Sequence, residues 1–169
     1  MIFIKYISII LVFFITFLIG YLISKKYSNR VTELKELQQA LNILENKIKF
    51  TYEPLKDIFH QMKDMVKGNI SDLFNEISIS SDRINIETAF EESLKNTKTN
   101  LEKEDIEILK SLSKILGKTE KEGQVSQIEL TQTFLKTQIN KAEKEEERNS
   151  KLYKTLGATV GLAFVIILI

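Results

Sequence analysis

Apolar segments without a charged residue stand near both ends of this chain. The first, Tyr6–Ile23, has 18 uncharged and mostly apolar residues, and the second, Thr155–Ile169, has 15. At about 1.5 Å of rise per helical residue, the first covers roughly 27 Å, close to the hydrocarbon thickness of a bilayer. Adding Leu152, Tyr153 and a snorkelling Lys154 brings the second to a similar length. Both are predicted to be transmembrane helices, with a cleaved signal and a buried core helix as the respective alternatives.

Basic residues flank both apolar segments on the side that faces the middle of the chain. Lysine and arginine close to a span bias that side toward the cytoplasm. The topology prediction therefore places both termini outside, with an N-terminal anchor at 1–24, a cytoplasmic domain at 25–154 and a C-terminal transmembrane segment at 155–169. The flanking residues are Lys25, Lys26, Arg30, Arg148, Lys151 and Lys154.

Between the two segments, apolar residues recur at helical spacing almost throughout. A 3-4-3-4 pattern places one stripe on a single helix face; its members are Leu34, Leu37, Leu41, Leu44 and Ile48. Further helices are predicted from Pro54 to Val66, over 70–77, over 86–97 and over 100–116. Gly68 and Gly117 are expected to end the helices that precede them, and the serine-rich segment 79–85 is expected to be a loop.

The last helix is predicted from local signals as well as from its period. Ser126 and Glu129 have the spacing of a capping box, and Val125 and Leu130 that of a hydrophobic staple. No glycine or proline follows until Gly157, so one helix is expected to run toward the second apolar segment. Its charged part, 143–151, is interpreted as a solvated stem. The predicted fold is all-α, with a cytoplasmic bundle of about six helices flanked by N- and C-terminal transmembrane helices.

Composition narrows the functional classes. The chain has 24 basic and 23 acidic residues, a balance that argues against a nucleic-acid partner. It has no cysteine, and hence neither a disulfide nor a thiolate metal site. The single histidine, His60, has no second ligand or nucleophile at hand, and no enzyme motif is found. We expect a non-enzymatic protein without catalytic, cofactor-binding or metal-binding residues and without a small-molecule substrate.

Small residues inside the apolar segments point to helix packing. Gly157 and Gly161 form a G-x-x-x-G step in the second segment, and Thr16, Gly20 and Ser24 repeat a small residue every fourth position near the first. Such steps let another helix approach closely, although small residues are also common in membrane helices that make no such contact.

Several longer patterns of this chain occur together in one known family. The first is the segment from Gly20 to Phe50, GYLISKKYSNRVTELKELQQALNILENKIKF, with the start at Pro54-Leu55 after it. A pattern L-G-x(6)-Q-x-x-x-I-x-L and a later pattern K-x-Y-x-x-L-G-x-x-x-G follow. Their residues here are Leu116, Gly117, Gln124, Ile128 and Leu130, with Leu135 beyond them, and then Lys151, Tyr153, Leu156, Gly157 and Gly161. Through these residues, nearly the whole chain resembles the stage III sporulation protein AB family of endospore-forming bacteria. Glu120 stands where the family favours aspartate, and 79–99 matches poorly.

The resemblance implies a place in the complex that links mother cell and forespore, in the outer forespore membrane. It implies a bundle similar to the cytoplasmic domain of the type II secretion platform protein, facing the mother-cell cytoplasm. The expected partners are other subunits of that complex, including its secretion-type ATPase. A generic membrane-anchored helical tether or signalling adaptor is the alternative. The candidate helix-packing and interface residues are Gly20, Gly117, Gln124, Tyr153, Gly157 and Gly161.

Overall fold

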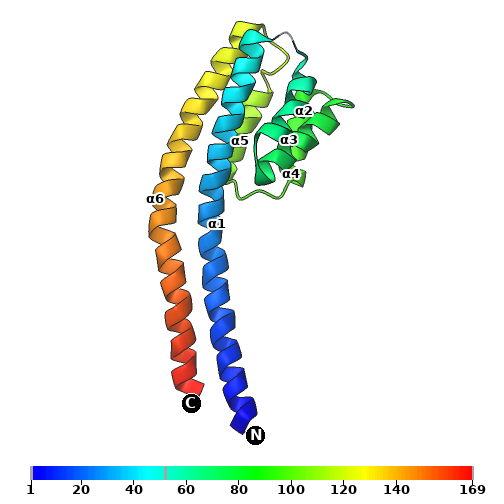
Figure 1. Cartoon of the computed structure of the whole chain (residues 1–169). Coiled ribbons are helices and arrows are strands. Elements are labelled where there is room, and N and C mark those ends of the chain that lie inside the picture. The colour runs from blue at the N-terminus through cyan, green and yellow to red at the C-terminus, as the bar shows by residue number, and fades with distance from the viewer. Residues whose placement is uncertain (1, 52, 169) are drawn as a thin grey trace. The chain divides into compact units, whose positions relative to one another are not determined.

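The computed structural model describes residues 2–51 and 53–168, and among these residues it contains six α-helices and no strand (Figure 1). The helices are α1 (Ile2–Phe50), α2 (Leu55–Met65), α3 (Gly68–Ser81), α4 (Ile86–Asn96), α5 (Lys103–Ser113) and α6 (Lys121–Leu168). The all-α prediction is confirmed. The first apolar segment and the leucine stripe that follows it belong to one helix, α1, of 49 residues, so the apolar segments are the ends of α1 and α6 rather than additional helices.

The chain divides into two compact units. The helix-pair unit comprises residues 1–31 and 141–169, and the bundle unit comprises Thr32–Asn140. Each of the long helices contributes its apolar end to the helix-pair unit and its other end to the bundle unit.

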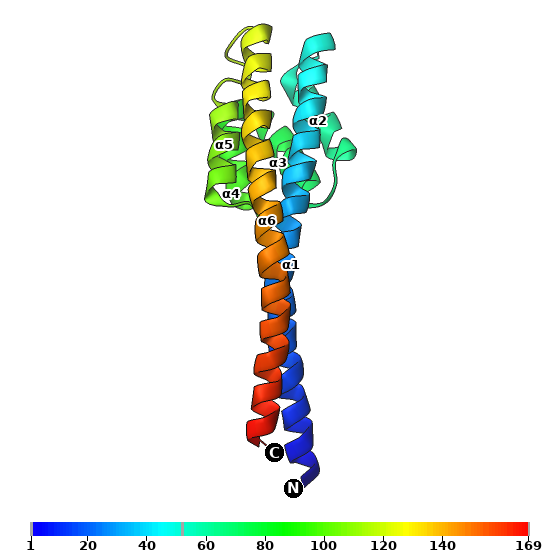
Figure 2. The same ribbon diagram turned by 90° about the vertical axis from the view of Figure 1, so that its left-hand side faces the viewer.

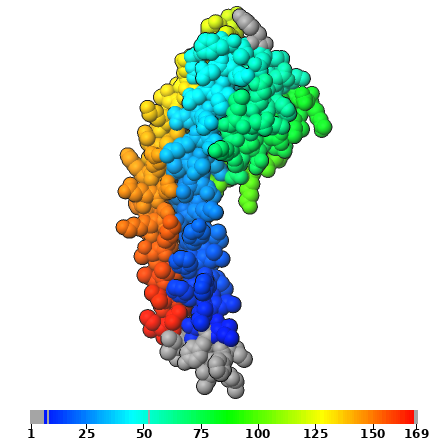
Figure 3. Space-filling model, in the orientation of Figure 1, coloured from blue at the N-terminus to red at the C-terminus, as the bar shows by residue number. Residues whose placement is uncertain are grey.

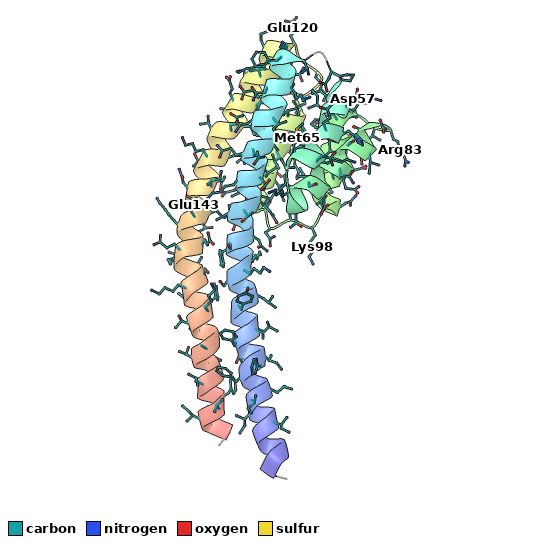
Figure 4. The ribbon with its side chains drawn as sticks, in the orientation of Figure 1. Asp57, Met65, Arg83, Lys98, Glu120 and Glu143 are labelled. Carbon is teal, nitrogen blue, oxygen red and sulfur yellow. The ribbon has the colours of Figure 1, made fainter. Side chains whose placement is uncertain are left out.

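The core of the bundle unit is built from large apolar side chains. All five members of the predicted α1 stripe are buried, with Leu34, Leu37 and Leu44 fully inaccessible to solvent. Phenylalanines from α2, α3 and α4 meet in a cluster, in which the ring of Phe90 lies 5.6 Å from that of Phe59 and 6.4 Å from that of Phe74. Edge-on arrangements at such distances are favourable for aromatic rings. Charged side chains such as Asp57, Arg83 and Lys98 are exposed and project outward from this unit (Figure 4).

Polar contacts join α1 to α6 beside this core. Lys49 forms ion pairs with Glu45 and, at 3.1 Å, with Glu129 of α6. Gln132 of α6 donates hydrogen bonds to Glu45 (2.9 Å) and to Asn42 (3.0 Å). The hydrogen bond from Lys49 holds the pKa of Glu45 below its usual value, and the bond to Glu45 raises the pKa of Lys49.

A buried carboxylate, Glu33 of α1, organises two connections of the bundle unit. Its oxygens accept hydrogen bonds at 2.6 Å from the side chain of Asn69 and from both the backbone and side-chain nitrogens of Asn100. Asn69 lies at the start of α3, and Asn100 lies in the connection between α4 and α5. Because a carboxylate can accept several hydrogen bonds at once, one side chain fixes both segments against α1.

Three local predictions are wrong, each for a physical reason. Gly68 does not end α2, which stops at an extended Val66; it is instead the first residue of α3, with φ of +58°. The segment 79–85 is only partly a loop, because α3 continues to Ser81 and keeps Ile77 and Ser78 buried.

The third wrong prediction is the capping box at Ser126. Helix α6 already begins at Lys121, so Ser126 lies inside it. Leu130, assigned to the staple, is 46% exposed. The capping box that does form is at α5, where the amide of Glu102 donates to Asp105 at 2.8 Å. The apolar positions along the first half of α6, Ile128, Leu135, Ile139 and Ala142, are buried at helical spacing.

Candidate helix-packing site

In the helix-pair unit, α1 and α6 run side by side in opposite directions. Figures 1 and 2 show the two helices adjacent in both views, with the N- and C-terminal ends at the same end of the pair. The space-filling view shows their side chains in contact (Figure 3). Both helices satisfy the length and composition of a membrane span, with 18-residue windows of mean hydropathy 2.0 and 1.3. Only 17% and 11% of those windows are buried, which makes them candidate membrane spans rather than core helices.

The two helices approach each other closely at two predicted glycines, Gly20 and Gly157. A Cβ added to Gly20 would lie 2.5 Å from the carbonyl oxygen of Tyr153 and 3.0 Å from the Cα of Gly157. A Cβ added to Gly157 would lie 3.0 Å from the carbonyl oxygen of Thr16. The obstacles are backbone atoms, which a rotamer change cannot move. The two helices therefore touch through their backbones here, and any larger residue must push them apart.

One turn toward the chain ends, Gly161 receives side chains from α1. A Cβ on Gly161 would lie 2.6 Å from the hydroxyl oxygen of Thr16 and 2.8 Å from the ring of Phe13. The Thr16 hydroxyl lies 2.9 Å from the carbonyl oxygen of Phe13 and 3.1 Å from that of Val12, so its hydrogen bond stays within α1. This pattern satisfies a hydroxyl in an apolar environment without a partner from the other helix.

Beyond Gly20, polar and aromatic contacts replace the glycines. The hydroxyls of Ser24 and Ser150 lie 2.6 Å apart, and Ser24 is buried. The rings of Tyr27 and Tyr153 stack with centroids 5.9 Å apart. These contacts lie at the end of the apolar segment where charged residues begin. The pairing of α1 and α6 therefore continues past the glycines, but through a hydrogen bond and an aromatic stack instead of backbone contact.

An ion pair lies one turn further along α1. Arg30 Nη1 is 2.8 Å from Glu145 Oε2, and only 4% of the arginine side chain is exposed. The sequence interpretation had used Arg30 as a flanking charge and had placed Glu145 in a solvated stem. One face of that stem instead contacts α1. Sequence reasoning missed this pair and the serine pair because neither is visible until the register of two segments more than 100 positions apart is known.

Gly117 and Gln124, the other two predicted interface residues, lie in the bundle unit. Gly117 has φ of +73°, a conformation that glycine adopts without a steric penalty. Its backbone amide donates to the side-chain oxygen of Gln124 at 3.1 Å, and the side-chain Nε2 of Gln124 donates to the carbonyl oxygen of Thr119 at 2.9 Å. The two residues thus fasten the turn between α5 and α6, which explains the spacing of the L-G-x(6)-Q pattern.

His60, the only histidine, is exposed, and its Nδ1 lies 3.3 Å from the hydroxyl of Ser78. Within the described ranges, no group of three or more His, Cys, Asp or Glu side chains is placed to hold a metal ion.

The all-α fold and two candidate membrane spans that pack antiparallel through glycines indicate a helical membrane protein. Comparison with known proteins identifies its family. A family model described as "Stage III sporulation protein AB (spore_III_AB)" matches residues 5–169. The chain therefore belongs to the stage III sporulation protein AB family.

Two individual proteins agree with this assignment. Stage III sporulation protein AB of Bacillus subtilis (strain 168) is 30% identical over 153 residues, covering 88% of this chain and 90% of that protein. A solved structure of a stage III sporulation protein AB superposes with a TM-score of 0.63 at 28% sequence identity, covering 70% of this chain and 96% of the solved one.

Proposed function

We propose that this protein is a non-enzymatic membrane component of the stage III sporulation complex between mother cell and forespore, and that its bundle unit is a docking platform for partner subunits. Family membership supports the assignment to sporulation. The main observation in support of the platform role is the glycine contact between α1 and α6. Because the two apolar segments pack against each other there, they can act together as a single membrane anchor. The 109 residues of the bundle unit (32–140) are then free to serve soluble partners.

The proposed topology has both termini outside and residues 25–154 in the cytoplasm of the mother cell, at the outer forespore membrane. The lysines and arginines that flank both apolar segments, on the side facing the middle of the chain, support this orientation. A reporter that fluoresces only in the cytoplasm should be bright when inserted near Ser81 and dark when fused to the C-terminus. A bright C-terminal fusion would contradict the topology while leaving the platform role to be judged by partner binding.

The partner that we propose for the bundle is the secretion-type ATPase of the complex, a soluble protein that a cytoplasmic platform can meet. Leu130 and Phe134 support a docking surface on α6, because they are 46% and 49% exposed and lie on one helix face at i, i+4 spacing. Large apolar side chains exposed together are more often found at protein interfaces than on inert surfaces.

Co-purification of the full chain with the ATPase in detergent tests this proposal. The double variant Leu130→Glu/Phe134→Glu should lower recovery of the ATPase about tenfold or more, since charges desolvated at an interface are costly. The control, Met65→Glu/Ile79→Glu, changes residues that are 43% and 48% exposed on other helices and should retain the partner. If the Leu130→Glu/Phe134→Glu variant lost another subunit but still recovered the ATPase, the platform role would stand and the ATPase would be refuted as the partner of this surface.

A further inference from the structure

A polar cavity lies on the helix-pair unit where its apolar surface gives way to charged residues. It has a volume of about 250 Å³ and is lined from both helices. Lys25 of α1 and Lys154 of α6 bring two ammonium groups to it, and Ser24 and Ser150 add hydroxyls that are hydrogen-bonded to each other. Tyr21, Ser28, Asn29 and Glu146 complete the lining.

The position of the cavity matches that of phospholipid headgroups. Tyr21 lies at its edge, and tyrosine is enriched where a span meets water. Phe17 and Leu18 precede Tyr21 by four and three residues, which places them on the same face of α1, and they are 42% and 55% exposed. The same face therefore offers an apolar path on one side of Tyr21 and cations and hydroxyls on the other.

The two lysines are available to bind a ligand. Both are exposed, and neither forms an ion pair with any of the residues that the structure describes. Two ammonium groups and nearby hydroxyl and amide groups suit the oxygens of a phosphodiester, because hydrogen bonds from a cation to an anion are stronger than neutral ones. Glu146 is the one acidic group in the lining, and its carboxylate can accept a hydrogen bond from a headgroup hydroxyl.

We propose that this cavity binds the headgroup of an anionic phospholipid, with the phosphate between Lys25 and Lys154. The bound lipid would then bridge α1 and α6 at the membrane surface, beside the Ser24–Ser150 contact. This site is independent of partner docking on the bundle unit.

Native mass spectrometry of the full chain in a neutral detergent, titrated with phosphatidylglycerol, tests the proposal. The variant Lys25→Gln/Lys154→Gln should weaken lipid binding about tenfold, as expected for the loss of charge-assisted hydrogen bonds. The matched control is Lys26→Gln/Lys151→Gln, which removes the same charge from exposed neighbours that do not line the cavity. It should weaken binding less than about threefold, since it reduces only the general attraction of the surface for anionic lipids.

Three further measurements make the result decisive. Phosphatidylcholine should bind more weakly than phosphatidylglycerol, and millimolar glycerol phosphate should not displace the lipid; displacement would identify a soluble phosphate as the ligand and overturn the lipid proposal. In each variant, a disulfide formed by Ser24→Cys and Ser150→Cys checks that the helices still pair. Equal loss of phosphatidylglycerol binding in the two double lysine variants would also overturn the lipid proposal.

Discussion

The helix-pair unit and the bundle unit are formed by the same two long helices but are held together in different ways. In the bundle unit, α1 contributes Leu34, Leu37 and Leu41, and burial of large side chains is the main stabilising effect. In the helix-pair unit, α1 contributes Thr16, Gly20 and Ser24, and the contact is made by backbone atoms, hydroxyls and one buried arginine.

The solvent explains this difference. In water, a leucine gains free energy when it leaves the solvent. Between membrane spans, lipid tails are as apolar as leucine, so a large side chain gains little by moving from lipid to a helix interface, whereas close backbone approach gains packing. The exposed surface of the pair agrees: Phe14, Leu18 and Leu162 are each more than half exposed and turned away from the contact.

The largest expected effect is in the bundle core. Replacing Phe74 with alanine should lower the free energy of unfolding by about 3–5 kcal/mol, because a buried ring is removed from the aromatic cluster and leaves a cavity. Leu41→Ala should cost about 2–5 kcal/mol for the same reason. Hydrogen exchange of the full chain in detergent would measure both in α2–α5. Ile79→Ala is the control, since that side chain is 48% exposed; equal effects in all three variants would contradict the core.

The next largest effect is expected in the helix-pair unit, where Gly157→Leu should separate the two helices and leave the bundle unit unchanged. Gly157→Leu places a large side chain against the backbone of α1, whereas Ala163→Leu adds a similar volume to an exposed position of the same helix. The chain has no native cysteine, so a disulfide between Ser24→Cys and Ser150→Cys reports pairing without background. We expect Gly157→Leu to reduce its yield severalfold and Ala163→Leu to leave it unchanged; a full yield in both would mean that close glycine contact is dispensable.

A smaller effect distinguishes two glycines of the bundle unit. Gly117→Ala should destabilise by about 1–2 kcal/mol, because its positive φ is unfavourable for a residue with a Cβ. Gly123→Ala lies inside α6, where alanine is favoured by about 0.5–1 kcal/mol. Its new methyl carbon would lie 3.1 Å from Oγ1 and 3.2 Å from Cβ of Thr119, so this one residue must shift slightly to admit it. Thermal unfolding followed by circular dichroism should therefore shift down for one variant and not for the other.

The smallest expected effect is on the stability of the protein at acidic pH. The pKa of Glu45 is lower in the folded protein, first because of the hydrogen bond from Lys49. The contribution of Glu45 to stability is therefore present above its unfolded pKa and is lost as the pH falls through the folded value. Glu45→Gln should make the acid-induced decline in melting temperature shallower below about pH 4.5. Glu92→Gln, at an exposed position, serves as the control and should reproduce the wild-type profile.

Much of the fold could be predicted from periodicity. The leucine stripe of α1 and the buried positions of α4 and α6 follow from spacing alone, because an amphipathic helix must bury its apolar face wherever it packs. Helix ends were less well predicted. Ser126 and Glu129 have the sequence of a capping box, but α6 already begins at Lys121, so Ser126 lies within the helix and is not its N-cap.

The candidate site was predicted in part. The structure brings four of the predicted residues, Gly20, Tyr153, Gly157 and Gly161, to one contact between α1 and α6. Whether these residues also face another subunit stays a prediction. Gly117 and Gln124 share a different task in the bundle unit, and the sequence could not separate the two groups because a small or polar residue looks the same in a turn and in a helix contact.

By itself, the sequence determined the helical class, the two apolar segments and the absence of cysteine chemistry, since these follow from composition and from patterns within one segment. Only the tertiary structure decided that Gly20 meets Gly157, that Ser24 meets Ser150 and that Arg30 pairs with Glu145. These contacts depend on the register between helices separated by more than 100 positions. Register is set by the sum of many weak packing contacts along both helices rather than by any local motif.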